Sequence, residues 1–234
     1  MIELRQVTKI YYRGRRGKQK PVKAVEQIDL TIESGEFIVI TGRSGCGKTT
    51  LLNLIAGLAR PNSGQVFVDG VDIWTLKDED ISGLRNHKMG FTFQVPSLIP
   101  TLNVVDNVVV PTMFAPKEKQ AEAYQRARQA LEAVGLSHQM DAFPRHLSAG
   151  EEKRVVIARA IINNPQVILG DEPTANLDEL TEKEVMALLQ KIHDGGTTII
   201  LVTHHAGLIG YGTKHLTMSD GKFIPESCMK INEK

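Results

Sequence analysis

The sequence predicts an α/β fold with a mostly parallel sheet, an N-terminal antiparallel β part and an inserted α-helical lobe. Three observations carry this prediction. A glycine-rich turn separates a buried strand from a helix within residues 37–56. Two further apolar strands, 166–170 and 197–202, lie on either side of a helical pattern. A long helical stretch occupies much of residues 95–164. Strands that alternate with helices indicate a parallel sheet whose ligand groups gather beyond the strands' carboxyl ends.

The N-terminal part reads as antiparallel β structure. Residues 1–11 alternate between apolar and polar side chains, which predicts a strand. Residues 25–32 alternate again, and we expect them to pair with the first strand. A short strand at 65–68 ends at Asp69-Gly70, which is a hairpin signal.

After a strand predicted at 89–94, the sequence pattern changes from strand to helix. From residue 95 to about 164, prolines interrupt the apolar pieces and a helix follows. The apolar side chains of this helix share one face: Tyr124, Ala127, Leu131 and Val134. We interpret 95–164 as a helical lobe inserted into a core of residues 1–94 and 165–234, all within one domain of residues 1–234.

The C-terminal third contains further strands of the predicted nucleotide-binding core. The predicted strand 166–170 is followed by Asp171, and the predicted strand 197–202 is followed by Thr203-His204. A closing hairpin is predicted at 214–222. Three polar side chains thus stand at the carboxyl ends of predicted strands: Gln94, Asp171 and His204.

Composition excludes several classes of protein. The 234 residues carry 28 basic and 27 acidic side chains, so no overall field favours a nucleic-acid partner. No apolar run reaches the roughly 18 to 20 residues that a membrane span needs. The N-terminus lacks a signal-peptide profile, and two cysteines are too few for a disulfide framework. We expect a cytosolic chain that can dock on a membrane protein.

The glycine-rich turn has the composition of a phosphate-binding loop. It consists of Gly42, Arg43, Ser44, Gly45, Cys46, Gly47, Lys48, Thr49 and Thr50. Its glycines allow the backbone to turn N–H groups inward, and the helix that follows adds its positive end. Lys48 can reach terminal phosphates, and the Thr49 hydroxyl can bind Mg²⁺. This strand, loop and helix predict a P-loop core that binds a nucleoside triphosphate.

The side chains at the strand ends supply the rest of the chemistry. Asp171 has the position from which a P-loop ATPase holds Mg²⁺ through water. Glu172 can orient or deprotonate the attacking water, although two such carboxylates could instead cap Pro173-Thr174. The Gln94 amide is suited to Mg²⁺ and water, and His204 can hydrogen-bond a γ-phosphate. Either of these two residues alone would be weak evidence.

A second motif runs from Leu147 to Arg154. Ser148 is predicted to cap a helix, and Gly150 to open access to the N–H groups of its first turn. The motif resembles the ABC signature, whose usual form is Leu-Ser-Gly-Gly-Gln. With the other motifs in the expected order, residues 1–224 resemble an ABC-type ATPase, and Ala175-Asn176-Leu177-Asp178 matches its D-loop.

The resemblance implies ATP and Mg²⁺ as ligands and two subunits packed head to tail, with Ser148 and Gly150 of each completing the other's site. It also implies that Tyr11, or alternatively Tyr12, stacks on adenine. The stretch from Phe93-Gln94 to Asp106-Asn107-Val108 is similar to the lipoprotein-release and macrolide-exporter group.

From the resemblance we expect ATP hydrolysis coupled to a transmembrane permease subunit, at the inner face of the cell membrane. An alternative within the family is transmembrane signalling without cargo, as in the cell-division relative. An ABC ATPase acting on DNA or ribosomes lacks support, because such proteins usually carry coiled-coil inserts or paired cassettes.

Three residues depart from the family pattern. Ala149 replaces the first signature glycine, Glu151 replaces the usual glutamine, and His205 stands where Asp is common. A Glu151 side chain turned inward would repel phosphate, whereas near the helix start it favours the dipole. The basic segment 13–23 is interpreted as a solvated loop, with contact to lipid headgroups or nucleic acid as the alternative.

Overall fold

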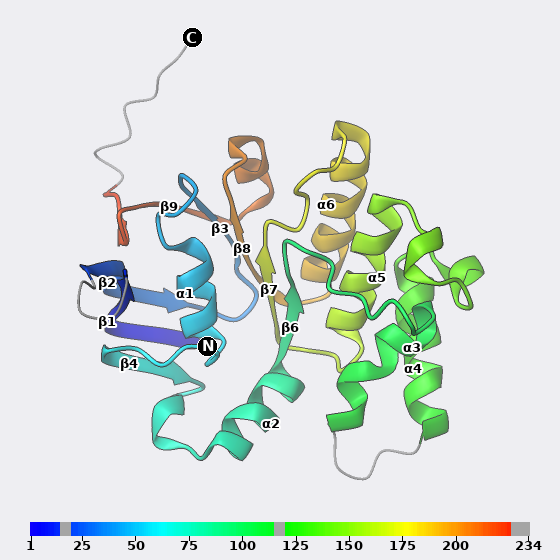
Figure 1. Cartoon of the computed structure of the whole chain (residues 1–234), viewed down its shortest axis with the longest axis horizontal. Helices are drawn as coiled ribbons and strands as arrows, with labels where there is room; N and C mark the ends of the chain where they lie inside the picture. Colours follow the sequence, from blue (N-terminus) through cyan, green and yellow to red (C-terminus); the bar gives the residue numbers. More distant parts are fainter. Residues whose placement is uncertain (15–19, 115–119, 226–234) are drawn as a thin grey trace. The chain divides into compact units, whose positions relative to one another are not determined.

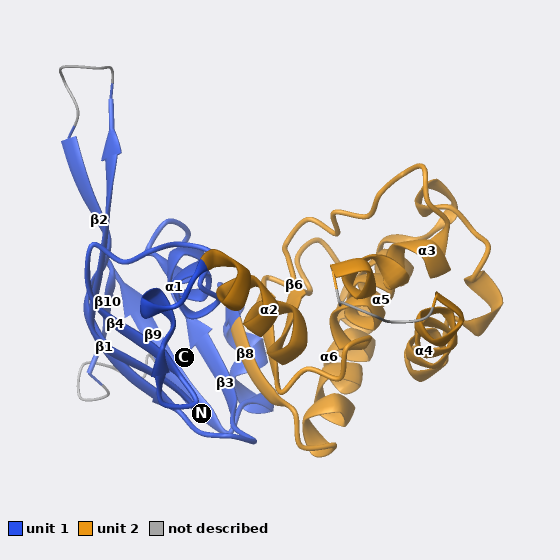
Figure 2. Cartoon of the chain, turned by 90° about the horizontal axis from the view of Figure 1, so that it is seen from below, with its two compact units in different colours: residues 1–77, 202–234 blue, residues 78–201 orange. Residues whose placement is uncertain are grey.

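The computed structural model describes residues 1–14, 20–114 and 120–225. The chain forms two compact units, residues 1–77 with 202–234 (unit 1) and residues 78–201 (unit 2; Figure 2). Within the described residues, no helix is both long and apolar enough to cross a membrane. The lobe predicted at 95–164 lies inside unit 2, and its boundaries remain a prediction.

The first sheet of unit 1 is antiparallel and has the strand order β2-β1-β4-β5 (Figure 1). Its strands are β1 (Ile2–Arg13), β2 (Lys20–Ile32), β4 (Ser63–Val68) and β5 (Val71–Asp72). Alternate side chains point to one face, so Ile2 and Leu4 are buried opposite Ile32 and Leu30.

A second group of strands in unit 1 carries the phosphate loop. Strand β3 (Phe37–Thr41) is buried throughout and pairs in parallel with β9 (Lys214–Ser219). Strand β10 (Lys222–Phe223) closes the predicted hairpin on β9. Helix α1 (Lys48–Ile55) contacts β1 and β2. Short 3₁₀ turns lie at η1 (Ile73–Thr75) and η5 (Ala206–Tyr211).

Unit 2 contains parallel strands and a group of helices. Strand β6 (Met89–Thr92) pairs in parallel with β7 (Val167–Asp171), and β8 (Thr198–Thr203), whose last two residues belong to unit 1, follows β7. Helices α3, α4 and α5 pack on one another. The helices are α2 (Asp78–Lys88), α3 (Val104–Val109), η2 (Val110–Phe114), α4 (Gln120–Ala133), η3 (Ser137–Gln139), η4 (Pro144–His146), α5 (Ala149–Ile161) and α6 (Glu179–Asp194).

The predicted fold class is confirmed, with three differences at the level of elements. Strand β6 ends at Thr92, so Gln94 lies two residues beyond it. Helix α2 was not predicted, because Ile81 and Leu84 are its only long apolar side chains and the rest of it is mostly polar. Strand β2 begins at Lys20, so part of the basic segment 13–23 is strand, and residues 15–19 of that segment lie outside the described residues.

Candidate functional site

The loop after β3 packs too closely on its neighbours for most side chains. An added Cβ at Gly47 would lie 2.0 Å from the Ala24 carbonyl oxygen, and one at Gly42 would lie 2.3 Å from that of Met218. Gly47 also has a φ of 111° where it caps α1. Glycine is therefore required at both positions to bring the loop backbone against β2 and β9.

Lys48 is folded back over this loop. Only 6% of the residue is exposed, and its Nζ donates to the carbonyl oxygens of Gly42 at 2.7 Å and Arg43 at 3.1 Å. Thr49 is exposed in the first turn of α1, whereas Cys46 is buried. A helix start beside an ammonium group is a site for a multiply charged anion such as a nucleotide phosphate.

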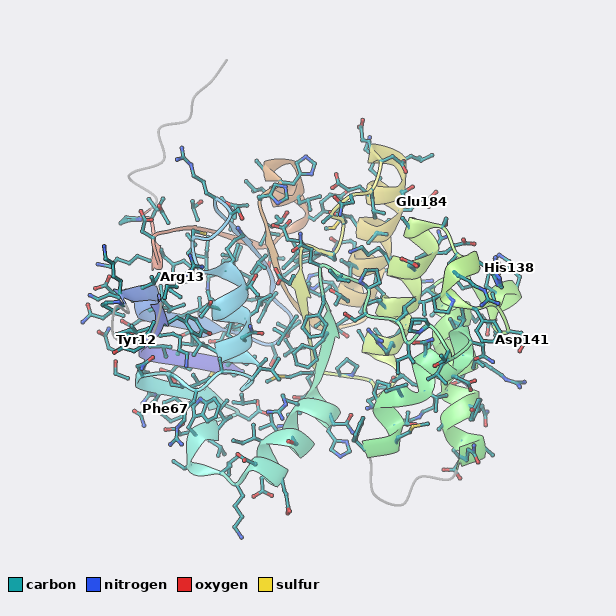
Figure 3. All side chains as sticks on the ribbon, viewed as in Figure 1. Tyr12, Arg13, Phe67, His138, Asp141 and Glu184 are labelled. Atoms are coloured by element: carbon teal, nitrogen blue, oxygen red, sulfur yellow. The ribbon has the colours of Figure 1, made fainter. Side chains whose placement is uncertain are left out.

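Two tyrosines lie near the end of strand β1 in unit 1. Tyr11 is 41% exposed and Tyr12 is 63% exposed, so each has a large part of its surface in contact with solvent. Figure 3 labels Tyr12 at the end of β1. The Lys9 ammonium lies 5.3 Å from the centre of the Tyr11 ring. His204 directly follows β8 and is exposed, and the next residue, His205, donates its backbone N–H to the Thr203 hydroxyl at 3.0 Å.

Two adjacent carboxylates of unit 2 stand at the end of β7. Asp171 is the last residue of the strand, and both it and Glu172 are half-buried. Glu172 has a φ of +49°, a conformation that costs a side-chain-bearing residue about 1–3 kcal/mol. The turn is held by the Ala175 N–H, which donates to the Glu172 carbonyl oxygen at 3.0 Å. Such strain is common where a side chain must be aimed at a ligand.

Gln94 is exposed in unit 2, and its backbone is held by a buried lysine. The Lys153 Nζ donates to the Gln94 carbonyl oxygen at 2.6 Å. Burial lowers the pKa of Lys153, while the carboxylates of Glu152 and Glu172 act in the opposite direction. The ammonium group is therefore within electrostatic influence of both the Gln94 segment and Glu172.

The signature motif begins α5 with a complete capping box. The Ser148 hydroxyl accepts the Glu151 N–H at 3.3 Å, and the Glu151 carboxylate accepts the Ser148 N–H at 2.8 Å. Gly150 is buried, and an added Cβ there would lie 2.5 Å from the Thr181 methyl carbon on α6. The glycine is thus also required for close packing of α5 on α6, a reason that the sequence did not suggest.

The Glu151 side chain makes its hydrogen bonds within and next to the signature motif. Its carboxylate also accepts the Ser148 hydroxyl at 2.8 Å and the Gln139 amide at 3.2 Å. The Ser148 N–H and hydroxyl lower the pKa of Glu151, so the carboxylate stays charged at neutral pH. Ala149 is exposed beside Ser148.

A protein-family model described as ABC transporter matches residues 25–175 of the chain. The chain belongs to the ABC transporter family. It is an ATP-binding and ATP-hydrolysing subunit of that family.

Three similar proteins illustrate this membership. The lipoprotein-releasing system ATP-binding protein LolD of Aquifex aeolicus is 42% identical over 85% of this chain and 88% of its own. The macrolide export ATP-binding/permease protein MacB 2 of Aeromonas hydrophila is 41% identical over 98% of this chain and 35% of its own. The ATP-binding cassette MJ0796, solved as a dimer bound to ADP and Pi, superposes with a TM-score of 0.87 at 36% identity, covering 96% of this chain and 97% of that one.

The ABC motifs thus lie in both units of this subunit. Unit 1 holds the phosphate loop, Tyr11 and His204, while unit 2 holds Gln94, Asp171-Glu172 and the signature. Within unit 2, Gln94 is connected to the signature helix through Lys153, which sequence reasoning missed. Lys153 lies in a run of charged residues that reads as a solvated surface, and no spacing rule marks it as buried.

Proposed function

We propose that this ABC ATPase binds and hydrolyses Mg²⁺-ATP through the roles that its motifs have in the family. The loop from Gly42 to Thr50 would bind the phosphates, Glu172 would activate the attacking water, and His204 would contact the γ-phosphate. Tyr11 would stack on the adenine ring. The observation that carries this proposal is the close-packed loop with Lys48 held over it at the start of α1.

Mg²⁺ fits the oxygen donors that the chain offers. Thr49 brings a hydroxyl, Asp171 a carboxylate and Gln94 an amide oxygen, and Mg²⁺ prefers such hard ligands together with waters and phosphate oxygens. The ion would neutralise charge on the β- and γ-phosphates. The protein's own groups would orient the nucleotide and the attacking water.

We further propose that two copies of the chain pack head to tail around ATP. Ser148 and Gly150 of one copy would contact the nucleotide held by Lys48 of the other. The cassette MJ0796 is dimeric in its ADP- and Pi-bound structure, and this chain matches it over almost its full length. The start of a helix favours a phosphate contact, and α5 begins directly after Ser148.

The hydrolysis would power a transmembrane permease subunit that exports or extracts a lipophilic molecule or a lipoprotein. MacB 2 joins an ATP-binding part and a permease in one chain, and LolD belongs to a lipoprotein-releasing system. By this proposal the subunit is cytoplasmic and lies at the inner face of the membrane through its permease partner. Co-purification of a transmembrane protein with the tagged chain would test the partnership, and its absence would argue against it.

The substitution Glu172→Gln tests the catalytic assignment. We expect the ATP dissociation constant to change by less than about threefold and kcat to fall by at least about 100-fold, because the neutral amide cannot take a proton from water. ATP should then hold the variant as a dimer on a sizing column. Glu179→Gln, which removes an exposed carboxylate from α6, should hydrolyse ATP normally. Near-normal turnover by Glu172→Gln would remove this residue from the catalytic role.

A further inference from the structure

Helix α5 holds the segment that follows β6 through three backbone carbonyl groups. The Lys153 Nζ donates to the Gln94 oxygen at 2.6 Å, and the two Arg159 nitrogens donate to the Pro96 and Ser97 oxygens at 3.0 Å each. Figure 1 shows this segment passing alongside α5. The three carbonyl groups lie within four consecutive residues, so the two cations hold one short stretch of backbone.

Lys153 is the more unusual of the two cations. The residue is 6% exposed, a burial that lysine rarely shows unless its charge has a partner. It lies within the signature motif, two residues after Glu151, on a helix that approaches β6 closely, since an added Cβ at Gly90 would lie 2.4 Å from the Ala160 carbonyl oxygen. Burial of a charged lysine costs free energy that a solvated lysine does not lose. The burial of Lys153 against Gln94 therefore needs an explanation.

The electrostatic surroundings of Lys153 link it to the hydrolytic end of β7. Its charged form is disfavoured by burial and favoured by the carboxylates of Glu152 and Glu172. Glu152 is its neighbour on α5, whereas Glu172 comes from the turn after β7. Within unit 2, the ammonium group of Lys153 thus belongs to the signature helix, donates a hydrogen bond to the Gln94 backbone and is influenced electrostatically by Glu172.

We propose that Lys153 is a positioning residue that fixes the Gln94 backbone to α5, so that Gln94 and the signature helix move together. This inference rests on the roles proposed above for Gln94 and Glu172. A displacement of α5 would carry the Gln94 carbonyl with it and change where the Gln94 side chain can reach. Hydrolysis would then depend on the placement of α5, while ATP binding by the loop of unit 1 would not.

Lys153→Met tests the proposal, because it keeps the length of the side chain and removes the donor and the charge. We expect kcat of the full chain to fall about tenfold while KM for ATP changes less than about twofold. Hydrogen exchange of peptides covering residues 93–99 should become faster by about tenfold, since Gln94 loses its connection to α5. Lys153→Arg, which keeps donor and charge, should restore kcat to within about threefold of wild type.

Ile157→Val is the matched control. This buried α5 residue should lower Tm without accelerating exchange at 93–99 or lowering kcat. If Lys153→Met does not fold, Lys153→Gln, which keeps a shorter neutral donor, should show the same pattern with a kcat loss of about threefold. Unchanged exchange at 93–99, or an equal kcat loss in Ile157→Val, would overturn the proposal. Hydrogen exchange does not depend on ATP turnover. It therefore tests the positioning role of Lys153 even if Glu172→Gln shows that the catalytic assignment is wrong.

Discussion

At the residue scale, the Ser148 hydroxyl has two possible acceptors in this ABC subunit. In the structure it donates to the Glu151 carboxylate at 2.8 Å. In the proposed dimer it would donate to a phosphate of the partner copy. In that dimer the carboxylate would compete with the nucleotide for the same proton, and it would place a negative charge near the phosphate. The capping box that stabilises α5 would weaken ATP binding between the two copies.

Removing this charge should strengthen the ATP-bound dimer. We expect Glu151→Gln to lower the ATP concentration for half-maximal dimerisation about fivefold, because one unit charge at contact distance in water is worth about 1 kcal/mol. Sizing chromatography across an ATP titration measures this. Glu132→Gln removes an exposed charge from α4 and should leave the titration unchanged. A weaker dimer in Glu151→Gln would mean that the carboxylate positions Ser148 for phosphate instead of competing with it.

The same carboxylate gives the fold a pH dependence of known sign. The Ser148 N–H and hydroxyl lower the pKa of Glu151 in the folded chain, so the unfolded chain binds more protons at acid pH. The stabilisation is complete above the pKa of the unfolded chain and is lost as pH falls through the lowered folded value. Urea unfolding should therefore show a smaller acid-induced loss of stability in Glu151→Gln than in wild type. An equal loss in both would assign the acid sensitivity to other carboxyl groups.

At the element scale, α3 fixes the irregular segment before it through one fully buried side chain. The Asn107 amide accepts the Ile99 N–H at 2.7 Å and donates to the carbonyl oxygens of Ile99 and Leu102 at 3.1 Å each and Asn103 at 2.9 Å. Asn103 in turn caps α3 by accepting the Asp106 N–H at 2.8 Å. Residues 99–103 thus have a defined conformation without regular secondary structure.

Removal of this amide should destabilise unit 2. We expect Asn107→Ala to lower the free energy of unfolding by about 2–4 kcal/mol, because several buried backbone groups lose their partner. Asn103→Ala removes a single capping bond and should cost about 1 kcal/mol. Urea unfolding curves compare the two variants. Equal losses would show that water replaces the Asn107 amide, and that this side chain does not organise the segment.

The sequence predicted those elements whose pattern is local. The β3 strand and the glycine loop share one continuous stretch, and Ser148 was predicted to cap α5. The reciprocal bond from Glu151 to Ser148 was not predicted. Helix α2 has an apolar face of only Ile81 and Leu84, which is too short to reveal a helical period. The Lys153 bond to Gln94 joins residues 59 positions apart, so no local rule could find it. The exposure of both Tyr11 and Tyr12 does not test the preference for Tyr11, so the adenine contact stays a prediction.

At the scale of the whole molecule, the ABC motifs of this chain are divided between two nucleotides in the proposed dimer. Lys48 begins α1 in unit 1, and Ser148 begins α5 in unit 2. Both helix starts can bind phosphate. If the copies pack head to tail, the two residues of one chain never serve the same ATP. The stoichiometry of bound nucleotide then depends on how lesions are distributed between two linked copies.

Two subunits fused in tandem test this arrangement most directly, with Lys48→Ala and Ser148→Arg as the lesions and occluded ATP as the measurement. Placed in opposite halves, the lesions fall on one composite site, and we predict about one tightly held ATP per fused dimer. Placed in the same half, they damage one site each, and we predict none. The reverse ordering would show that each signature serves its own subunit's nucleotide, and the head-to-tail dimer would be wrong.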